Sequence, residues 1–144
     1  MIVTCEKKYA LRAVFELAKH QDHGPVKGAE IARSQAIPVR FLEAILGKLK
    51  RIGLVTTKRG FRGGYTLGRP AREITVGSVF EPLETASCMA GTGECAEKTA
   101  CPFSEGCVFL PMWDEVRGSI SDVYRGTTIQ DLLDDEHAVP VKTD

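Results

Sequence analysis

Long hydrophobic runs and a net charge are both missing from this sequence of 144 residues. No stretch of about 18 consecutive apolar residues occurs, which excludes a transmembrane helix of ordinary length. The first residues, MIVTCEKKYALRAVF, lack the charged and then apolar pattern of a signal peptide. We therefore expect a soluble, cytoplasmic protein without a membrane partner. A chain of this length accommodates one cored domain and an appendage, but not two full domains.

Catalytic motifs are missing as well. No nucleophile with a neighbouring base and no glycine-rich phosphate loop can be recognised, so we expect that the protein is not an enzyme. Internal repeats and low-complexity tracts are also not evident. The formal charge of the whole chain is zero, and composition therefore does not by itself indicate a nucleic-acid partner.

The charge is, however, unevenly distributed along the chain. Residues 40–72 contain nine basic side chains and one acidic side chain, a local net charge of +8. A solvated basic surface would give the same count, but a polyanionic partner explains this concentration better. The basic residues are Arg40, Lys48, Lys50, Arg51, Lys58, Arg59, Arg62, Arg69 and Arg72.

Three helices are expected in the first third of the chain. Apolar residues recur at helical spacing over residues 4–20, and Thr4 is placed to cap the first turn. A short helix over residues 27–35 follows. Pro38 suits the first turn of a third helix, residues 38–51, which has one apolar stripe and one exposed basic side. The stripe consists of Leu42, Ile45, Leu46 and Leu49.

Two short β-branched runs, residues 54–58 and 65–67, enclose the segment RGFRGG and predict a hairpin with a glycine-rich basic tip. Thr75 is placed to cap a further short helix, whose last turn Pro82 makes irregular. Near the C-terminus, Pro111 opens a long helix that ends at Gly126. The segment Thr128-Ile129-Gln130-Asp131 then forms the capping box of a short last helix.

These elements, in this order, predict a winged helix-turn-helix. We expect a mostly α fold with a β-hairpin wing and a long C-terminal dimerisation helix. The DNA-binding domain would cover residues 1–83 and a cysteine-rich cluster-binding loop residues 84–111. Residues 112–134 would hold the dimerisation helix and the short last helix, and residues 135–144 a disordered tail.

Such a fold binds double-stranded DNA through two elements. A helix fits the major groove, and a flexible hairpin tip lets arginine reach phosphates or the minor groove. Arg40 and Phe41 begin the third helix, and Arg59 and Arg62 occupy the wing. The residues predicted to contact DNA are Arg40, Phe41, Glu43, Lys48, Lys58, Arg59, Arg62 and Tyr65.

Four of the five cysteines lie close together, which in a reducing cytoplasm favours metal ligation over disulfides. The spacing Cys95-x5-Cys101-x5-Cys107 is wider than the C-x2-C pairs of zinc fingers. Soft thiolates suit an iron–sulfur cluster or zinc. We expect an iron–sulfur cluster held by Cys95, Cys101 and Cys107 with Cys88. A zinc site and unligated redox-active thiols remain alternatives, and Cys5 is interpreted as a small buried hydrophobe.

Over about residues 1–134 the chain resembles the iron–sulfur winged-helix transcription repressors, the IscR/NsrR-like regulators. This resemblance implies a homodimer formed through the long C-terminal helix, with the cysteine loop beside the partner's first helix. It also implies a 2Fe-2S or 4Fe-4S cluster. The residues that carry it are Thr4 with Tyr9-Ala10, Gly24-Pro25-Val26, Phe41-Leu42-Glu43, Gly53-Leu54-Val55, Arg59-Gly60 with Gly63-Gly64-Tyr65, the cysteine run and Trp113.

The fourth cluster ligand departs from the family pattern. Leu110 stands where some members have a histidine, and Lys8 stands where others have an acidic residue. Cys88 is our preferred substitute, and Cys5 or Glu6 from the second subunit are the alternatives. Among functions, we expect a DNA-binding regulator that senses iron, redox state or nitric oxide. The alternatives are a zinc- or thiol-based regulator of the same fold, and a small iron–sulfur carrier, which would gain nothing from the concentrated basic charge.

Overall fold

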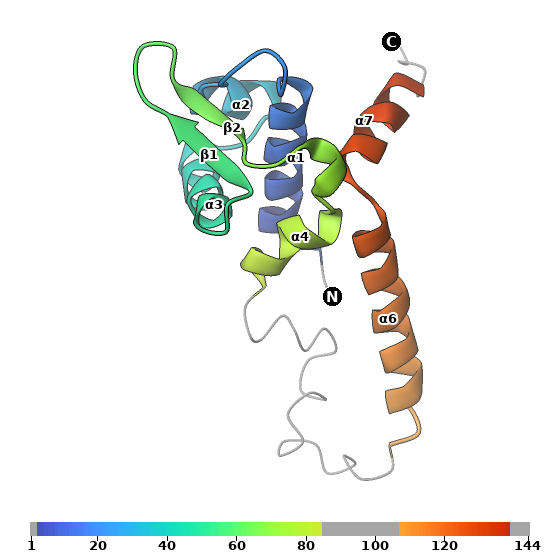
Figure 1. Cartoon of the computed structure of the whole chain (residues 1–144). Helices are drawn as coiled ribbons and strands as arrows, with labels where there is room; N and C mark the ends of the chain where they lie inside the picture. Colours follow the sequence, from blue (N-terminus) through green and yellow to red (C-terminus); the bar gives the residue numbers. More distant parts are fainter. Residues whose placement is uncertain (1–2, 85–106, 139–144) are drawn as a thin grey trace, which may run out of the picture.

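Helices make up most of the described chain, and the sheet found there is a two-stranded hairpin (Figure 1). The structure, a computed structural model, describes residues 3–84 and 107–138. The predicted mostly α fold with a β-hairpin wing is confirmed. The elements are α1 (Cys5–Lys19), α2 (Gly28–Ser34), α3 (Val39–Arg51), β1 (Val55–Lys58), β2 (Gly64–Leu67), the 3-10 turn η1 (Ala71–Glu73), α4 (Val76–Phe80), the 3-10 turn η2 (Glu81–Leu83), α6 (Leu110–Gly126) and α7 (Ile129–Ala138).

Helix α1 lies at the centre of the fold, where it contacts α2, α3, α4, α7 and β2. Thr4 caps it as predicted, because its hydroxyl accepts a hydrogen bond from the Lys7 N–H at 3.3 Å. The apolar residues of its predicted inner face are buried, except for Tyr9, which is half-buried. The sequence pattern did not reveal that Lys7 and Glu16, both charged, are buried as well.

Helix α3 follows the predicted pattern closely. Its buried residues are the four of the predicted apolar stripe, each no more than 1% exposed. Pro38 precedes the helix as its cap residue, with no side-chain hydrogen bond. Beyond the C-terminal end, Gly53 has a φ of +75°, a conformation that glycine adopts without steric cost. The chain therefore turns sharply from α3 into β1, which fixes the wing beside this helix.

The hairpin is antiparallel, with Val55 opposite Leu67 and Lys58 opposite Gly64. Near its turn, the backbone of Tyr65, which lies opposite Thr57, pairs with that of Val26 through two hydrogen bonds of 2.9 and 2.8 Å. Glycine is required beside this bridge, since a Cβ on Gly64 would lie 2.5 Å from the Val26 carbonyl oxygen. The wing is therefore held on the segment that leads into α2, as well as on α3.

Helix α4 is the predicted short helix after the wing. The Thr75 hydroxyl accepts a hydrogen bond from the Ser78 N–H at 3.1 Å, and Ser78 Oγ in turn accepts one from the Thr75 N–H at 3.1 Å. The helix then tightens into the 3-10 turn η2, which contains Pro82, as its sequence predicted.

The two C-terminal helices differ in how they are attached. In Figure 1, α6 stands away from the other helices at one end, and none of its residues is buried. Helix α7 returns to the body through Ile129 and Leu133, which are buried in the same core as α1. The Ile129 N–H also donates to the Ile74 carbonyl at 2.8 Å. None of the helices in the described parts of the chain is long and apolar enough to cross a membrane.

The prediction of a disordered tail from residue 135 was wrong for residues 135–138, which belong to α7. The capping box starts this helix: Asp131 accepts a hydrogen bond from the Thr128 N–H at 2.8 Å and donates its own N–H to the Thr128 hydroxyl at 3.1 Å. The Thr128 hydroxyl and N–H together lower the pKa of Asp131. At the other end, Lys19 of α1 pairs with Glu136 at 2.7 Å, which compensates part of the acidic charge. Residues 139–144 lie outside the described residues.

Candidate nucleic-acid interface

The N-terminal end of α3 presents its predicted contact residues to solvent. Arg40, Phe41 and Glu43 are all exposed, and Phe41 is 61% exposed. Within the described residues, neither Arg40 nor Glu43 forms an ion pair. The Phe41 ring lies near that of Tyr9, with centroids 6.4 Å apart, so its position is supported from α1. This end of α3 can therefore enter a groove without first breaking an ion pair of the described fold.

Lys48, another predicted contact, lies in a different environment. Its Nζ lies 2.5 Å from Oε1 of Glu6 on α1, and both side chains are about one-third exposed. The carboxylate offsets the charge that this lysine would offer to a phosphate. Contact with DNA through Lys48 stays a prediction, and it would require the ammonium to leave Glu6 or to bind both groups.

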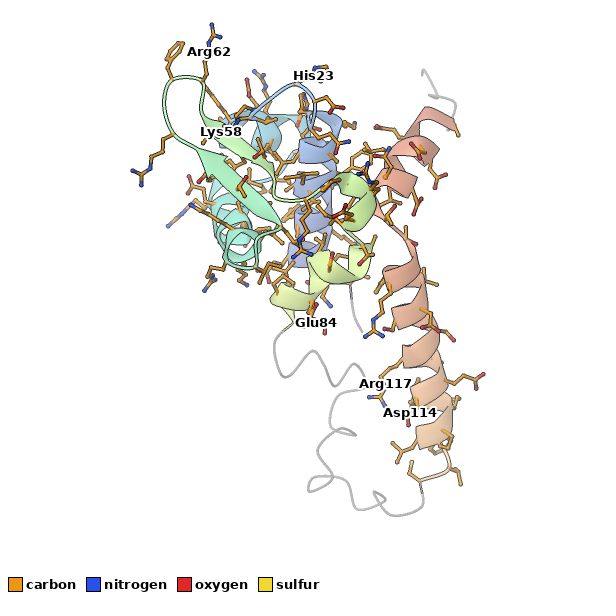
Figure 2. The ribbon with its side chains drawn as sticks, viewed as in Figure 1. His23, Lys58, Arg62, Glu84, Asp114 and Arg117 are labelled. Carbon is orange, nitrogen blue, oxygen red and sulfur yellow. The ribbon has the colours of Figure 1, made fainter. Side chains whose placement is uncertain are left out.

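The tip of the wing is a tight turn that begins at Gly60 and ends at Gly63. The Gly63 N–H donates to the Gly60 carbonyl at 2.9 Å, and Gly60 has a φ of +106°. A Cβ on Gly63 would lie 2.3 Å from the Lys58 carbonyl oxygen, so only glycine fits there. Lys58, Arg59 and Arg62 are all exposed, and Figure 2 shows Arg62 at the tip, directed away from the helices. The turn thus places cationic side chains where nothing in the described fold competes for them.

Tyr65 lies on β2 opposite Thr57, and not in the turn itself. The residue is half-buried and packs against the hydrophobic core. A Cβ on Gly28 would lie 3.4 Å from Cε2 of the Tyr65 ring, which shows how closely the ring approaches the start of α2. The structure therefore gives Tyr65 a packing role, and its predicted contact with DNA stays untested.

Two residues of this surface escaped the sequence analysis. Phe61 occupies the turn between Gly60 and Arg62 and is 91% exposed. Lys27, at the start of α2, places its Nζ 5.5 Å from the centroid of the Phe61 ring. The signal for Phe61 was available, because turn positions usually carry Gly, Pro, Asn, Asp or Ser rather than an aromatic residue. The proximity of Lys27 depends on the bridge between Val26 and Tyr65, which no local pattern predicts.

A second exposed surface, which we call the α6 face, is apolar. Met112, Trp113, Val116 and Val123 lie on α6 at spacings of three, four or seven, which place them on one side of the helix, and Val108 and Phe109 directly precede it. Asp114 and Arg117 form an ion pair near the N-terminal end of the same helix (Figure 2). A group of exposed apolar side chains of this size marks an interaction surface. The α6 face consists of Val108, Phe109, Met112, Trp113, Val116 and Val123.

The predicted cluster ligands lie mostly outside the described residues, since only Cys107 of the four is described. Cys107 is half-buried and lies three residues before the start of α6, and the Leu110 N–H donates to its carbonyl at 3.3 Å. Cys5 is exposed at the start of α1, contrary to its interpretation as a buried hydrophobe, because the inner face of α1 begins with Lys7. Within the described residues no three His, Cys, Asp or Glu side chains form a group able to hold a metal ion. Cys88, Cys95 and Cys101 lie outside them.

Comparison with known proteins places this arrangement among transcriptional regulators. Residues 3–135 match the model of the Rrf2 family, described as an iron-dependent transcriptional regulator. The chain is 30% identical over 141 residues to the HTH-type transcriptional regulator IscR of Pectobacterium carotovorum, covering 98% of this chain and 84% of that protein. The solved structure of T. potens IscR is similar with a TM-score of 0.81 and 30% identity, over 99% of this chain and 94% of that one. CymR, the global cysteine regulator of B. subtilis, gives a TM-score of 0.75 and 28% identity, over 92% and 95%.

Proposed function

Because the chain belongs to the Rrf2 family of transcriptional regulators, we propose that it binds double-stranded DNA as a homodimer and represses transcription in response to an iron–sulfur cluster. The signal would be iron, redox state or nitric oxide. Its relatives are named transcriptional regulators, which confirms that it is not an enzyme. One observation above all supports DNA binding in this chain: the exposed start of α3 and the cationic wing tip lie on one domain, with Arg40, Arg59 and Arg62 free of ion pairs within the described residues.

Replacing Arg59 by alanine tests the wing. Arg59 is exposed beside the turn, so its loss should leave the fold intact and remove one phosphate contact. We expect weaker binding to every duplex and a decrease of about one unit in the slope of log K against log salt concentration. Fluorescence anisotropy at several salt concentrations measures both. Lys19→Ala, which removes a positive charge that pairs with Glu136 instead, is the matched control. An unchanged slope for Arg59→Ala would exclude the wing from the interface.

The homodimer rests on the α6 face. An isolated subunit would leave these apolar side chains in water, whereas two α6 helices packed together would cover them. In such a dimer each α3 enters one major groove, and the two half-sites lie about one helical turn, roughly 34 Å, apart. The operator should therefore be pseudo-palindromic.

Sedimentation tests the dimer. We expect the protein to sediment as a dimer at micromolar concentration and Val116→Asp to sediment as a monomer, since a buried unpaired carboxylate opposes association. Gly118→Asp introduces the same charge into the same helix, at a position where a Cβ would meet nothing within 4 Å. This control should remain dimeric. A monomeric parent protein, or a dimeric Val116→Asp variant, would contradict the proposed interface.

The cluster would be held by Cys95, Cys101 and Cys107, with Cys88 as the preferred fourth ligand. Cys107 supports this set, because this half-buried residue carries a soft donor three residues before α6. Glu6 is the weaker alternative, since its carboxylate already pairs with Lys48. When bound, the cluster would supply an iron centre that changes with redox state and with small reactive ligands. Zinc or free thiols would give a regulator of the same fold with a different signal.

Anaerobic purification followed by iron, sulfide and zinc analysis, absorbance and Mössbauer spectroscopy distinguishes these cases. Iron with acid-labile sulfide in equal amounts supports the cluster, and the amount of iron per subunit together with the Mössbauer spectrum gives its type. Zinc without sulfide would replace the cluster by a zinc site. If neither iron nor zinc is found, the protein would be a thiol-based regulator. Iron and sulfide without any DNA binding would indicate the small iron–sulfur carrier.

A further inference from the structure

The tip of the wing combines an apolar ring with cationic side chains. Phe61 and Arg62 occupy the two corner positions of the turn closed by the hydrogen bond between Gly63 and Gly60. Corner side chains project away from the strands. Phe61 is 91% exposed, the highest value among the exposed large hydrophobic residues of the described chain. The ring is therefore the foremost apolar group of the element that approaches DNA.

The surroundings of the ring indicate what it meets. Lys58, Arg59 and Arg62 are exposed on the same hairpin, and Lys27 Nζ lies 5.5 Å from the ring centroid. No acidic residue occurs between residues 44 and 72. An exposed aromatic ring surrounded by cationic side chains is complementary to a partner that has stacked apolar surfaces between rows of negative charge. A DNA duplex has this combination, since its base pairs lie between two rows of phosphates.

We propose that Phe61 inserts between two adjacent base pairs from the minor groove, unstacks that step and kinks the duplex. This inference rests on the proposed function, and it deepens it by naming a residue that sets sequence preference. Phenylalanine is one of the side chains that minor-groove proteins use as an apolar insert, and the resulting kinks are about 20–90°. Lys27, whose Nζ lies over the ring in the free protein, would move off it on insertion, and Lys27 and Arg62 would then contact the phosphates on either side of the opened step.

Insertion makes the wing selective without a hydrogen bond to a base. The free energy needed to unstack a step depends on its sequence, and the flexible pyrimidine–purine steps TA and CA/TG unstack most readily. Operators should therefore carry such a step beneath each wing. Because Phe61 makes no polar contact with a base, several bases would be accepted at neighbouring positions.

The test uses a duplex selected from a random pool by the full-length protein, with 2-aminopurine placed at successive positions. We expect the parent protein to raise the 2-aminopurine fluorescence several-fold at one step in each half-site. Phe61→Leu, which keeps an apolar insert, should retain part of this rise, and Phe61→Ala should abolish it. The Ala variant should also bind about tenfold more weakly, the loss of one stacking contact, with an unchanged salt slope. Since Phe61 is exposed, the thermal midpoints of the free variants should match that of the parent.

The same measurements distinguish a loss of Phe61 insertion from a loss of DNA binding itself. A parent protein that selects no sequence and shows no salt-dependent binding would remove the function itself. A parent protein that binds its selected duplex without a local fluorescence rise would overturn the insertion alone. An equal rise with Phe61→Ala would do the same, because the unstacking would then come from other residues.

Discussion

Glu84→Gln is expected to lower the free energy of unfolding by about 3 kcal/mol, the cost of leaving a buried charge without its counter-ion. Lys7 is 1% exposed and its Nζ lies 3.1 Å from Oε1 of Glu84, whose side chain is 14% exposed. The ring of Phe80 covers the same ammonium, with 5.5 Å between Nζ and the ring centroid. Within the described residues, Glu84 provides the one carboxylate paired with this ammonium. Urea unfolding followed by circular dichroism, at one fixed protein concentration, measures the loss.

Two further variants show whether the ion pair is responsible. Lys7→Met combined with Glu84→Gln removes both charges, so it should recover most of the lost stability. Glu81→Gln changes an exposed carboxylate on the same 3-10 turn and should alter the unfolding free energy by no more than about 0.5 kcal/mol. If the double variant is as unstable as Glu84→Gln, the destabilisation comes from the altered side chain at residue 84 and not from an unpaired lysine.

Loading of the cluster is expected to change the affinity of the protein for DNA. Glu84 is held on α1 by Lys7, and Cys107 lies three residues before α6, whose other end packs on α4 through Tyr124 and Phe80. A cluster ligated between these two positions would fix the N-terminal end of α6 relative to the DNA-binding helices. Since both α3 helices must fit half-sites at one spacing, we expect cluster loading to change operator affinity by about 5- to 150-fold, a coupling of about 1–3 kcal/mol.

Gel-shift titrations of cluster-loaded and apo protein on one operator at fixed salt measure this coupling. Substituting Cys95, Cys101 or Cys107 by serine should abolish the cluster and give the apo affinity, with fold and dimer retained. Cys88→Ser tests the fourth ligand separately. Full cluster occupancy in that variant would assign the fourth ligand to a residue of α1, and Cys5→Ser would then be tested in the same way. Equal affinity of both forms would leave a DNA-binding regulator without the proposed sensing mechanism.

The features that the sequence predicted are those set by local physics. Helical spacing identified the inner stripe of α3 from Leu42 to Leu49, and the caps at Thr4, Thr75 and Thr128 marked three helix starts. Each of these signals lies within a few residues of the structure it determines. The turn at the wing tip was predictable for the same reason, because glycine is needed for its backbone conformation.

The features that escaped prediction join residues that are distant in sequence. Lys7 pairs with Glu84, and Lys48 with Glu6, although neither charge has an opposite partner at helical spacing. Lys7 in particular interrupts the apolar pattern, so sequence periodicity alone predicts solvent exposure for a side chain that is buried. Charge counting likewise predicted that Lys48 contacts DNA, and it did not reveal that Lys48 pairs with the carboxylate of Glu6. Such pairings depend on how α1 packs against α3 and α4, which local patterns do not contain.

The bridge between Val26 and Tyr65 determines how much variation in operator spacing the protein can accept. Because β2 is bonded through Tyr65 to the segment before α2, and β1 follows closely on the end of α3, the wing cannot swing independently of α3. In the proposed DNA complex, the distance between the residues of α3 in the major groove and those of the wing in the adjacent minor groove would therefore be fixed. Inserting one base pair between these two contacts displaces one of them by about 3.4 Å along the duplex. A rigid wing cannot follow this displacement, so such an operator should lose the contacts of one element entirely.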